Sequence, residues 1–210
     1  MKKIILIIVF ITLGFSCAFL FLSEKETHEK TLFQQTIEIP TEPFIRKHLL
    51  HKDGTIRTNL EGKNGYQLAL SESLGLWMEY LVAKQDFEGF EEAYETLLRT
   101  FVLPEGIIVW KVENGERAQT NALIDDLRIM KALFAAGKHE NRKDFIQTAI
   151  SIAESLAKYN RKGEYFVDFY DVKHQYANEE ITLSYLDRES FRYMVQYGAI
   201  DEETLKNLDE

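Results

Sequence analysis

The sequence predicts an all-α fold, namely an incomplete (α/α)6 toroid of helical hairpins with short β-hairpin excursions. From residue 41 onward, apolar residues recur at helical spacing, and two stretches with the strand period of two interrupt them. Only three prolines and eleven glycines occur in 210 residues, which favours helices over a many-turned β-sandwich. About seven helices are expected, whereas six hairpins need about twelve, so the predicted ring is incomplete.

The first helix is expected over residues 44–49, because Phe44, Ile45, His48 and Leu49 can share one face. It should stop at residues 52–54, since Gly54 can adopt the left-handed conformation. In the second helix Ser71 is the expected N-cap. Its apolar positions repeat at intervals of four and three residues: Leu74, Met78 and Leu81.

A third helix is expected from about Glu88 to just before Pro104, with an apolar face made of Phe90, Ala93, Leu97 and Phe101. The pattern then changes to a period of two over residues 107–112. Asn114 and Gly115 form the preferred pair for a tight hairpin turn before residues 117–119. A short hairpin between helices is therefore predicted here.

Two longer helices are expected next, over residues 122–136, ending at Gly137, and over residues 142–159. Residues 163–170 have a strand-like pattern. Two weaker helices, over about 187–197 and 201–208, complete the prediction.

The N-terminus carries an export signal. Lys2 and Lys3 precede an uninterrupted apolar run over residues 4–22, which is close to the roughly 20 residues needed to span a bilayer. This favours an uncleaved membrane anchor (1–22), a linker (23–40) and an extracytoplasmic domain (41–210). Lipidation at Cys17, a cleaved and released signal, and a buried core helix are the alternatives.

Composition excludes several classes of function. Lys2 and Lys3 account for two of the 25 basic residues, so 23 basic groups face 34 acidic ones in residues 23–210. That balance argues against a nucleic-acid partner, which needs a basic face. Cys17 is the single cysteine of the sequence, and the histidines are scattered, so no metal site is predicted. No cofactor is implied.

The remaining chemistry lies in carboxylates and aromatic residues, a combination that suits glycans. Glu72 is the first candidate, because it falls in the first turn of a helix whose approach is mostly uncharged. Partial burial there would raise its pKa, as a general acid requires. Its alternative role is a favourable charge at a helix N-terminus. The same two interpretations apply to the second candidate, the pair Asp125 and Asp126.

Several segments resemble glycoside hydrolase family 8, which contains endoglucanases, chitosanases, lichenases and xylanases. Residues 70–78 resemble its Ser-Glu-Gly-x-Gly-Tyr-Gly-Met segment, and residues 122–136 are similar in spacing to its signature Ala-Thr-Asp-Ala-Asp-x-x-Ile-Ala-x-Ala-Leu. Residues 51–56, 85–90 and 109–111 resemble three further segments, all in the family's order. The resemblance extends over roughly residues 44–195.

This resemblance implies an inverting hydrolase of a β-linked polysaccharide, a glucan or amino-glucan. Glu72 matches the general acid, and Asp126 matches the second signature aspartate, which contacts the sugar at the scissile bond; Ile124 replaces the first. Trp110, Asn121, Asp125 and Tyr185 are the expected substrate-binding residues. Trp110 has core packing as its alternative, and Trp77 is expected in the core.

The general base is not identified by the resemblance. Asp187 is a weak candidate, and the alternative is a base beyond Glu210, which would make this chain the N-terminal portion of such a hydrolase. Inversion requires a separate carboxylate at about 6.5–9.5 Å from the acid, to admit the water. A non-catalytic glycan-binding protein and a truncated, inactive fragment are therefore the competing hypotheses.

Overall fold

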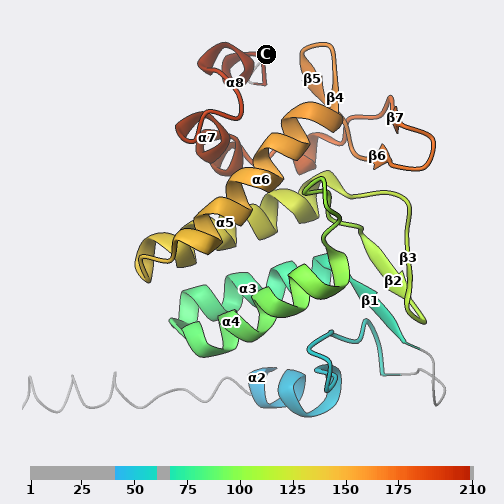
Figure 1. Cartoon of the computed structure of the whole chain (residues 1–210), viewed down its shortest axis with the longest axis vertical. Coiled ribbons are helices and arrows are strands. Elements are labelled where there is room, and N and C mark those ends of the chain that lie inside the picture. Colours follow the sequence, from blue (N-terminus) through green and yellow to red (C-terminus); the bar gives the residue numbers. More distant parts are fainter. Residues whose placement is uncertain (1–40, 61–66, 209–210) are drawn as a thin grey trace, which may run out of the picture. The chain divides into compact units, whose positions relative to one another are not determined.

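The computed structural model describes residues 41–60 and 67–208 (Figure 1). The chain divides into two compact units, Met1–Pro43 and Phe44–Glu210. The expected anchor (1–22) and linker (23–40) lie outside the described residues. Among those described, no helix is both long and apolar enough to cross a bilayer.

The first described elements are short: a four-residue helix, α2 (Thr41–Phe44), and a π-helical turn, η1 (Ile45–Leu49). A helical hairpin follows them. The hairpin consists of α3 (Ser71–Lys84) and α4 (Phe87–Thr96), and α4 continues into a second π-helical turn, η2 (Leu97–Phe101). Asp86 caps α4 by accepting a hydrogen bond from the Gly89 amide at 3.0 Å. The four apolar residues expected on this inner face are all buried.

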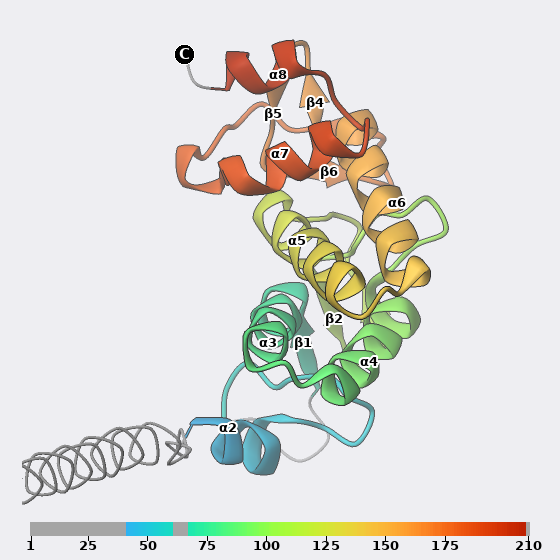
Figure 2. The same ribbon diagram turned by 90° about the vertical axis from the view of Figure 1, so that its left-hand side faces the viewer.

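A second hairpin packs on the first and carries the last helices. It consists of α5 (Leu123–His139) and α6 (Lys143–Tyr159), and α5 packs against α3, α6 and α7 (Figures 1 and 2). A 3-10 turn, η3 (Leu183–Tyr185), leads to α7 (Arg188–Gln196) and α8 (Glu202–Asn207). The expected architecture of paired helices with small strand excursions is confirmed.

In the part of the chain that the structure describes, three small antiparallel sheets connect the helices. The largest contains β1 (Leu68–Leu70), β2 (Lys111–Glu113) and β3 (Glu116–Arg117) in that order. The other two pair β4 (Arg161–Lys162) with β5 (Tyr165–Phe166), and β6 (Tyr170–Asp171) with β7 (Tyr176–Ala177). The turn at Asn114 and Gly115 has φ of 50° and 84°, as the predicted hairpin requires.

The structure corrects three local predictions. The predicted two-stranded hairpin is a three-stranded sheet, because β1 joins β2 by pairing Ala69 with Val112. Ser71 is the first residue of α3, not its N-cap, and Leu70 occupies the cap position. Gly137 lies inside α5, where a Cβ would come within 2.7 Å of Ile146 Cδ1. That glycine therefore permits close packing of α6 and does not end the helix.

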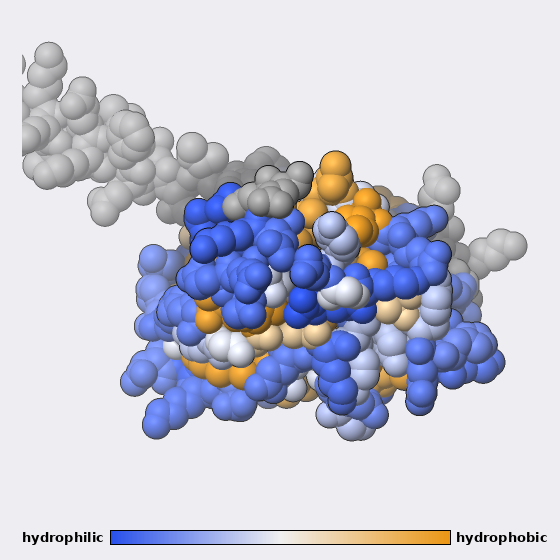
Figure 3. Space-filling view, turned by 90° about the horizontal axis from the view of Figure 1, so that it is seen from above, coloured by the Kyte–Doolittle hydropathy of each residue, from blue (hydrophilic) through white to orange (hydrophobic). Residues whose placement is uncertain are grey.

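The core is formed where α3, α4, α5 and α6 meet, and Trp77 belongs to it as expected, with 5% of its surface exposed. The face seen in Figure 3 is mostly hydrophilic, with a group of hydrophobic atoms among it. Between α6 and α7, large exposed apolar side chains occur at Tyr165, Tyr176, Ile181 and Leu183. These residues lie on the excursions and not on the packed helix faces.

Candidate active site

Two helices begin side by side at the candidate site. Ser71, the first residue of α3, donates from its Oγ to Asp125 Oδ2 of α5 at 3.0 Å. The Ser71 amide and hydroxyl also donate to the Trp110 carbonyl, at 3.0 and 3.3 Å. Ser71 therefore joins three segments: the first turn of α3, the first turn of α5 and the chain that leads into β2.

Glu72 follows Ser71 and lies on the solvent side of this junction. Its side chain is exposed, so the expectation of partial burial is wrong. Its charge acts on the carboxyl of Asp125. The structure thus places an accessible carboxyl next to a buried one, with the accessible group on the first turn of α3.

Asp125 is the buried member of this pair, with 6% of its surface exposed. Burial raises the pKa of its carboxyl, and the negative charge of Glu72 acts in the same direction. The hydrogen bond from Ser71 and the guanidinium of Arg128, at 3.2 Å from Asp125 Oδ1, oppose that rise. Asp125 is therefore a carboxyl whose protonation depends on its neighbours.

Asp126 lies deeper, in an uncharged polar cluster. It is 1% exposed and accepts a hydrogen bond from Asn121 Nδ2 at 2.8 Å, while its second oxygen, Oδ1, is buried with no partner among the described residues. Asn121 also donates to Asn160 Oδ1 at 2.8 Å and accepts from the Tyr170 amide at 2.7 Å. Burial raises the pKa of Asp126 well above its usual range.

This burial gives no support to direct sugar contact by Asp126 or by Asn121, which is 3% exposed. Their hydrogen bonds join the start of α5, the end of α6 and the strand β6. Asp126 and Asn121 therefore lie beneath the surface of the site and hold the elements around it together.

Asp187, the weak candidate for the base, caps α7 by accepting from the Glu189 amide at 3.3 Å. It also accepts from Ser190 Oγ at 2.6 Å and pairs with Lys131 at 3.1 Å. Although burial acts to raise its pKa, the bonds from Ser190 and Lys131 bring it below the usual value. A carboxylate with lowered proton affinity and three donors is poorly suited to accept a proton.

The expected aromatic residues differ in accessibility. The Trp110 side chain is 37% exposed, and Lys111 Nζ lies 5.4 Å from the centre of its ring. The Trp110 carbonyl accepts from Ser71, so the backbone at Trp110 is fixed at the start of α3. Tyr185 lies in η3 and packs partly buried against the core. Trp110 is therefore the better placed of the two for a ligand.

Comparison with known proteins shows similarity in sequence and in fold. No model of a known protein family matches the chain. YdaJ of Bacillus subtilis, named as a candidate lipoprotein, is 39% identical over 209 residues, which cover 96% of this chain and 54% of YdaJ. A structure described as a novel alpha-amylase from Clostridium perfringens is 32% identical, with a TM-score of 0.70 over 79% of this chain and 51% of that one.

Endoglucanase Cel10 of Klebsiella pneumoniae, a family 8 glycosyl hydrolase, superimposes with a TM-score of 0.62 at 20% identity, over 80% of this chain and 58% of Cel10. This chain has the family 8 glycoside hydrolase fold. The resemblance found in the sequence is thereby confirmed. The chain spans about half the length of the relatives that it matches.

Two contributions to the site differ from the expectations. Ser71 is expected as a helix cap, whereas its hydroxyl links α3 to α5. Arg128 is not among the expected site residues, yet it contacts both Asp125 and Glu79, the latter at 3.5 Å. Its spacing of three residues from Asp125 on a helix was the available signal.

Gly75 brings the two helices of the site close together. A Cβ at this position would lie 3.1 Å from Ile129 Cγ1 and 3.2 Å from Arg128 Cδ. The absence of a side chain on α3 therefore makes room for the aliphatic part of Arg128 on α5. Within residues 41–60 and 67–208, no three His, Cys, Asp or Glu side chains are grouped in a way that could hold a metal ion.

Proposed function

We propose that this chain binds a polysaccharide across the N-termini of α3 and α5 and that Glu72 protonates the glycosidic oxygen during hydrolysis. The observation that carries the proposal is the accessible carboxyl of Glu72 beside the buried carboxyl of Asp125, on a family 8 fold. The named activities of the endoglucanase and alpha-amylase relatives agree with a glycan substrate.

In the proposed reaction, the proton of Glu72 moves to the bridging oxygen as the bond from that oxygen to the anomeric carbon breaks. The developing positive charge on the sugar is favoured by nearby carboxylate, which Asp125 supplies when ionised. Water attacks from the opposite face and loses its proton to a base, giving inversion. No cofactor takes part in these steps.

A second candidate function is glycan binding without turnover. The observation that favours it is the environment of Asp187, whose carboxylate is occupied by Lys131, Ser190 and a backbone amide. We assign the base to no described residue. Measurable oligosaccharide binding without release of reducing ends would favour this second function.

The test compares the full chain with its Glu72→Gln variant. Reducing ends released from soluble cellulose, chitosan, starch and poly-N-acetylglucosamine are measured, with circular dichroism as the check on folding. Glu72→Gln should lower any turnover by at least about 100-fold, because general acid catalysis contributes about 10²–10⁴. Glu154→Gln, at an exposed position on α6, is the matched control and should leave the rate unchanged. Equal turnover by wild type and Glu72→Gln would remove the assignment.

We further propose an extracytoplasmic location with attachment to the membrane through the N-terminal segment. The apolar run over residues 4–22, Cys17 and the name of the relative YdaJ support this proposal. Metabolic labelling with a palmitate analogue distinguishes the two kinds of anchor. Label lost on Cys17→Ser indicates a lipid anchor, whereas membrane association without label indicates a spanning segment.

A further inference from the structure

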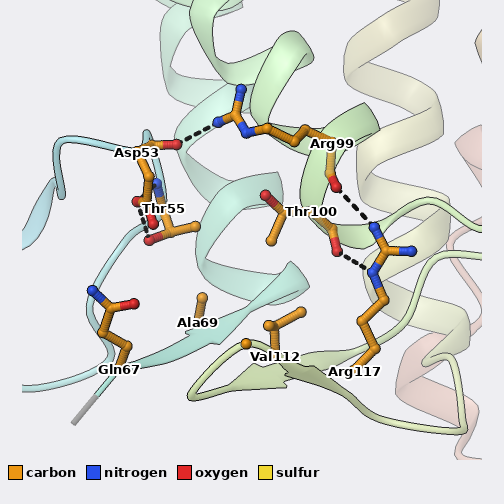
Figure 4. Close-up of a pocket in the computed structure, with 9 residues that line it drawn as sticks. Asp53, Thr55, Gln67, Ala69, Arg99, Thr100, Val112 and Arg117 are labelled. Carbon is orange, nitrogen blue, oxygen red and sulfur yellow. Dashed lines mark hydrogen bonds between the residues drawn. The ribbon is translucent and has the colours of Figure 1, made fainter. Parts of the chain in front are cut away.

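A cavity lies beside the three-stranded sheet, apart from the junction of Ser71 and Asp125 (Figure 4). Its volume of about 320 Å³ is at the lower end of the roughly 300–1,000 Å³ of small-molecule sites. Ala69 of β1 and Val112 of β2 form an apolar floor, and Thr55, Gln67 and Thr100 add hydroxyl and amide groups at its sides.

Two guanidinium groups stand at this cavity and are held in place by main-chain carbonyls. Arg117 donates from Nε to the Thr100 carbonyl and from Nη2 to the Arg99 carbonyl, both at 2.8 Å. Arg99 donates to the Asp53 carbonyl and, at 3.3 Å, to Thr96 Oγ1. A guanidinium has five N–H donors, so these contacts leave donors for a ligand while restricting the side-chain conformation.

The charge of the lining is positive on an otherwise acidic chain. Arg99 and Arg117 contribute two positive charges, and Asp53 contributes one negative charge. The Asp53 carboxylate accepts bonds from the Thr55 amide at 3.0 Å and from Thr55 Oγ1 at 2.7 Å. Both bonds reach Oδ1, so this oxygen of Asp53 is engaged by Thr55, and Arg99 contacts the main-chain carbonyl of Asp53 instead.

We propose that this cavity binds an acidic sugar unit, a uronic acid, of the polysaccharide substrate. Guanidinium groups recognise a carboxylate through paired hydrogen bonds, hydroxyl and amide groups suit sugar hydroxyls, and the apolar floor suits a ring face. A small inorganic anion would use only the charges. The strand β1 links the two places, since Ala69 lines the cavity and Ser71, two residues later, begins α3.

This inference rests on the proposed function for its polymer and extends it to the substrate class, an acidic polysaccharide. The experiment measures binding and not turnover, so its failure is distinct from failure of the hydrolase assignment. Calorimetry on the full chain compares tetragalacturonate, neutral cellotetraose and inorganic phosphate. Tetragalacturonate should bind at least about tenfold more tightly than cellotetraose, because a charge-assisted pair adds more than a neutral bond.

Substitutions then locate the binding. Arg117→Gln should weaken tetragalacturonate binding by about tenfold or more and leave cellotetraose unchanged. Arg117→Lys should give an intermediate loss, because it keeps the charge and loses the fork. Arg192→Gln, at an exposed position on α7, removes the same charge elsewhere and should have no effect.

Arg117→Gln could also disturb the chain at Arg99 and Thr100, whose carbonyls Arg117 contacts. A measurement on the wild type avoids this problem. The Nε–H resonances of Arg99 and Arg117 should shift on titration of the wild type with galacturonate and stay unchanged with glucose. Equal affinity of wild type and Arg117→Gln for tetragalacturonate would overturn the proposal. So would cellotetraose binding as tight as that of the acid, or full displacement of tetragalacturonate by equimolar phosphate.

Discussion

Ser71 and Asp125, 54 positions apart, form a buried hydrogen bond of 3.0 Å that joins the first turns of α3 and α5. Both residues are nearly inaccessible, at 0% and 6% exposure. The bond fixes the first turn of α3 against α5. The exposed carboxyl of Glu72 extends into solvent from that same turn. The candidate site therefore depends on a contact between two helices rather than on a single motif.

The first prediction removes this bond. Ser71→Ala should lower the free energy of unfolding by about 1–2 kcal/mol, because the buried Oδ2 of Asp125 loses its donor, while the Trp110 carbonyl keeps the Ser71 amide. The loss should grow as pH rises, since the Ser71 bond favours the ionised form of Asp125 and holds its pKa down. Urea unfolding at several pH values measures both effects. Ser73→Ala, two residues further along α3, is the control. A loss of stability in Ser73→Ala equal to that in Ser71→Ala would contradict the prediction.

The second prediction concerns the ionisation of Asp126, whose pKa is raised well above its usual value by burial. Above pH 4 the unfolded chain releases this proton and the folded chain keeps it, so stability falls as pH rises toward the folded pKa. Asp126→Asn cannot ionise and keeps an acceptor for Asn121. Its stability relative to the wild type should therefore increase with pH, by up to about 1.4 kcal/mol per unit within that window.

Urea unfolding of wild type and Asp126→Asn at pH 5, 6, 7 and 8 measures the difference. The matched variant Asp126→Leu should be destabilised at every pH, because it leaves the Asn121 amide without that acceptor. Parallel stability profiles for wild type and Asp126→Asn would show that Asp126 ionises equally in both states, contrary to the prediction.

The third prediction compares two glycines with positive φ. Gly54 has φ of 82°, and a Cβ there would come within 2.1 Å of Thr96 Oγ1 and 3.2 Å of Thr96 Cβ. Gly115 has a similar φ of 84°, and a Cβ there would have no atom of the described residues within 4 Å. Gly115→Ala should cost about 1 kcal/mol from backbone strain alone, and Gly54→Ala about 1–3 kcal/mol more from overpacking. Thermal unfolding of both variants measures the two losses of stability. Equal losses would show that the contact with Thr96 adds no cost at Gly54.

The fourth prediction concerns the docking of α7. The ring of Phe134 on α5 is fully buried and stacks on Tyr197 at 4.2 Å and on Tyr193 at 5.2 Å between centroids. Phe134→Ala should cost about 3–5 kcal/mol, because it removes a large buried ring and leaves a cavity. Tyr165→Ala, at a position that is 55% exposed, should change stability by less than about 0.5 kcal/mol. A cost below about 1 kcal/mol for Phe134→Ala would show that this stack contributes little.

The helices could be predicted because each carries its own periodic apolar face. The inner face of α4 and η2 and the extent of α6 follow from spacing alone, and the turn at Asn114 and Gly115 follows from local backbone preference. Strand partners could not be predicted in this way. The three residues of β1 contain too little pattern, and their pairing with β2 depends on segments more than 40 positions apart.

The candidate site shows the same division. The sequence by itself determined the residue types: Glu72 at a helix start, the pair Asp125 and Asp126, and the order of segments shared with the family 8 fold. Only the tertiary structure decided that Glu72 is exposed, that Asp125 is buried at 6% exposure and that Asp126 is buried still deeper at 1%. The physical reason is that burial and charge at these groups come from neighbours on other elements, and local sequence does not specify those neighbours.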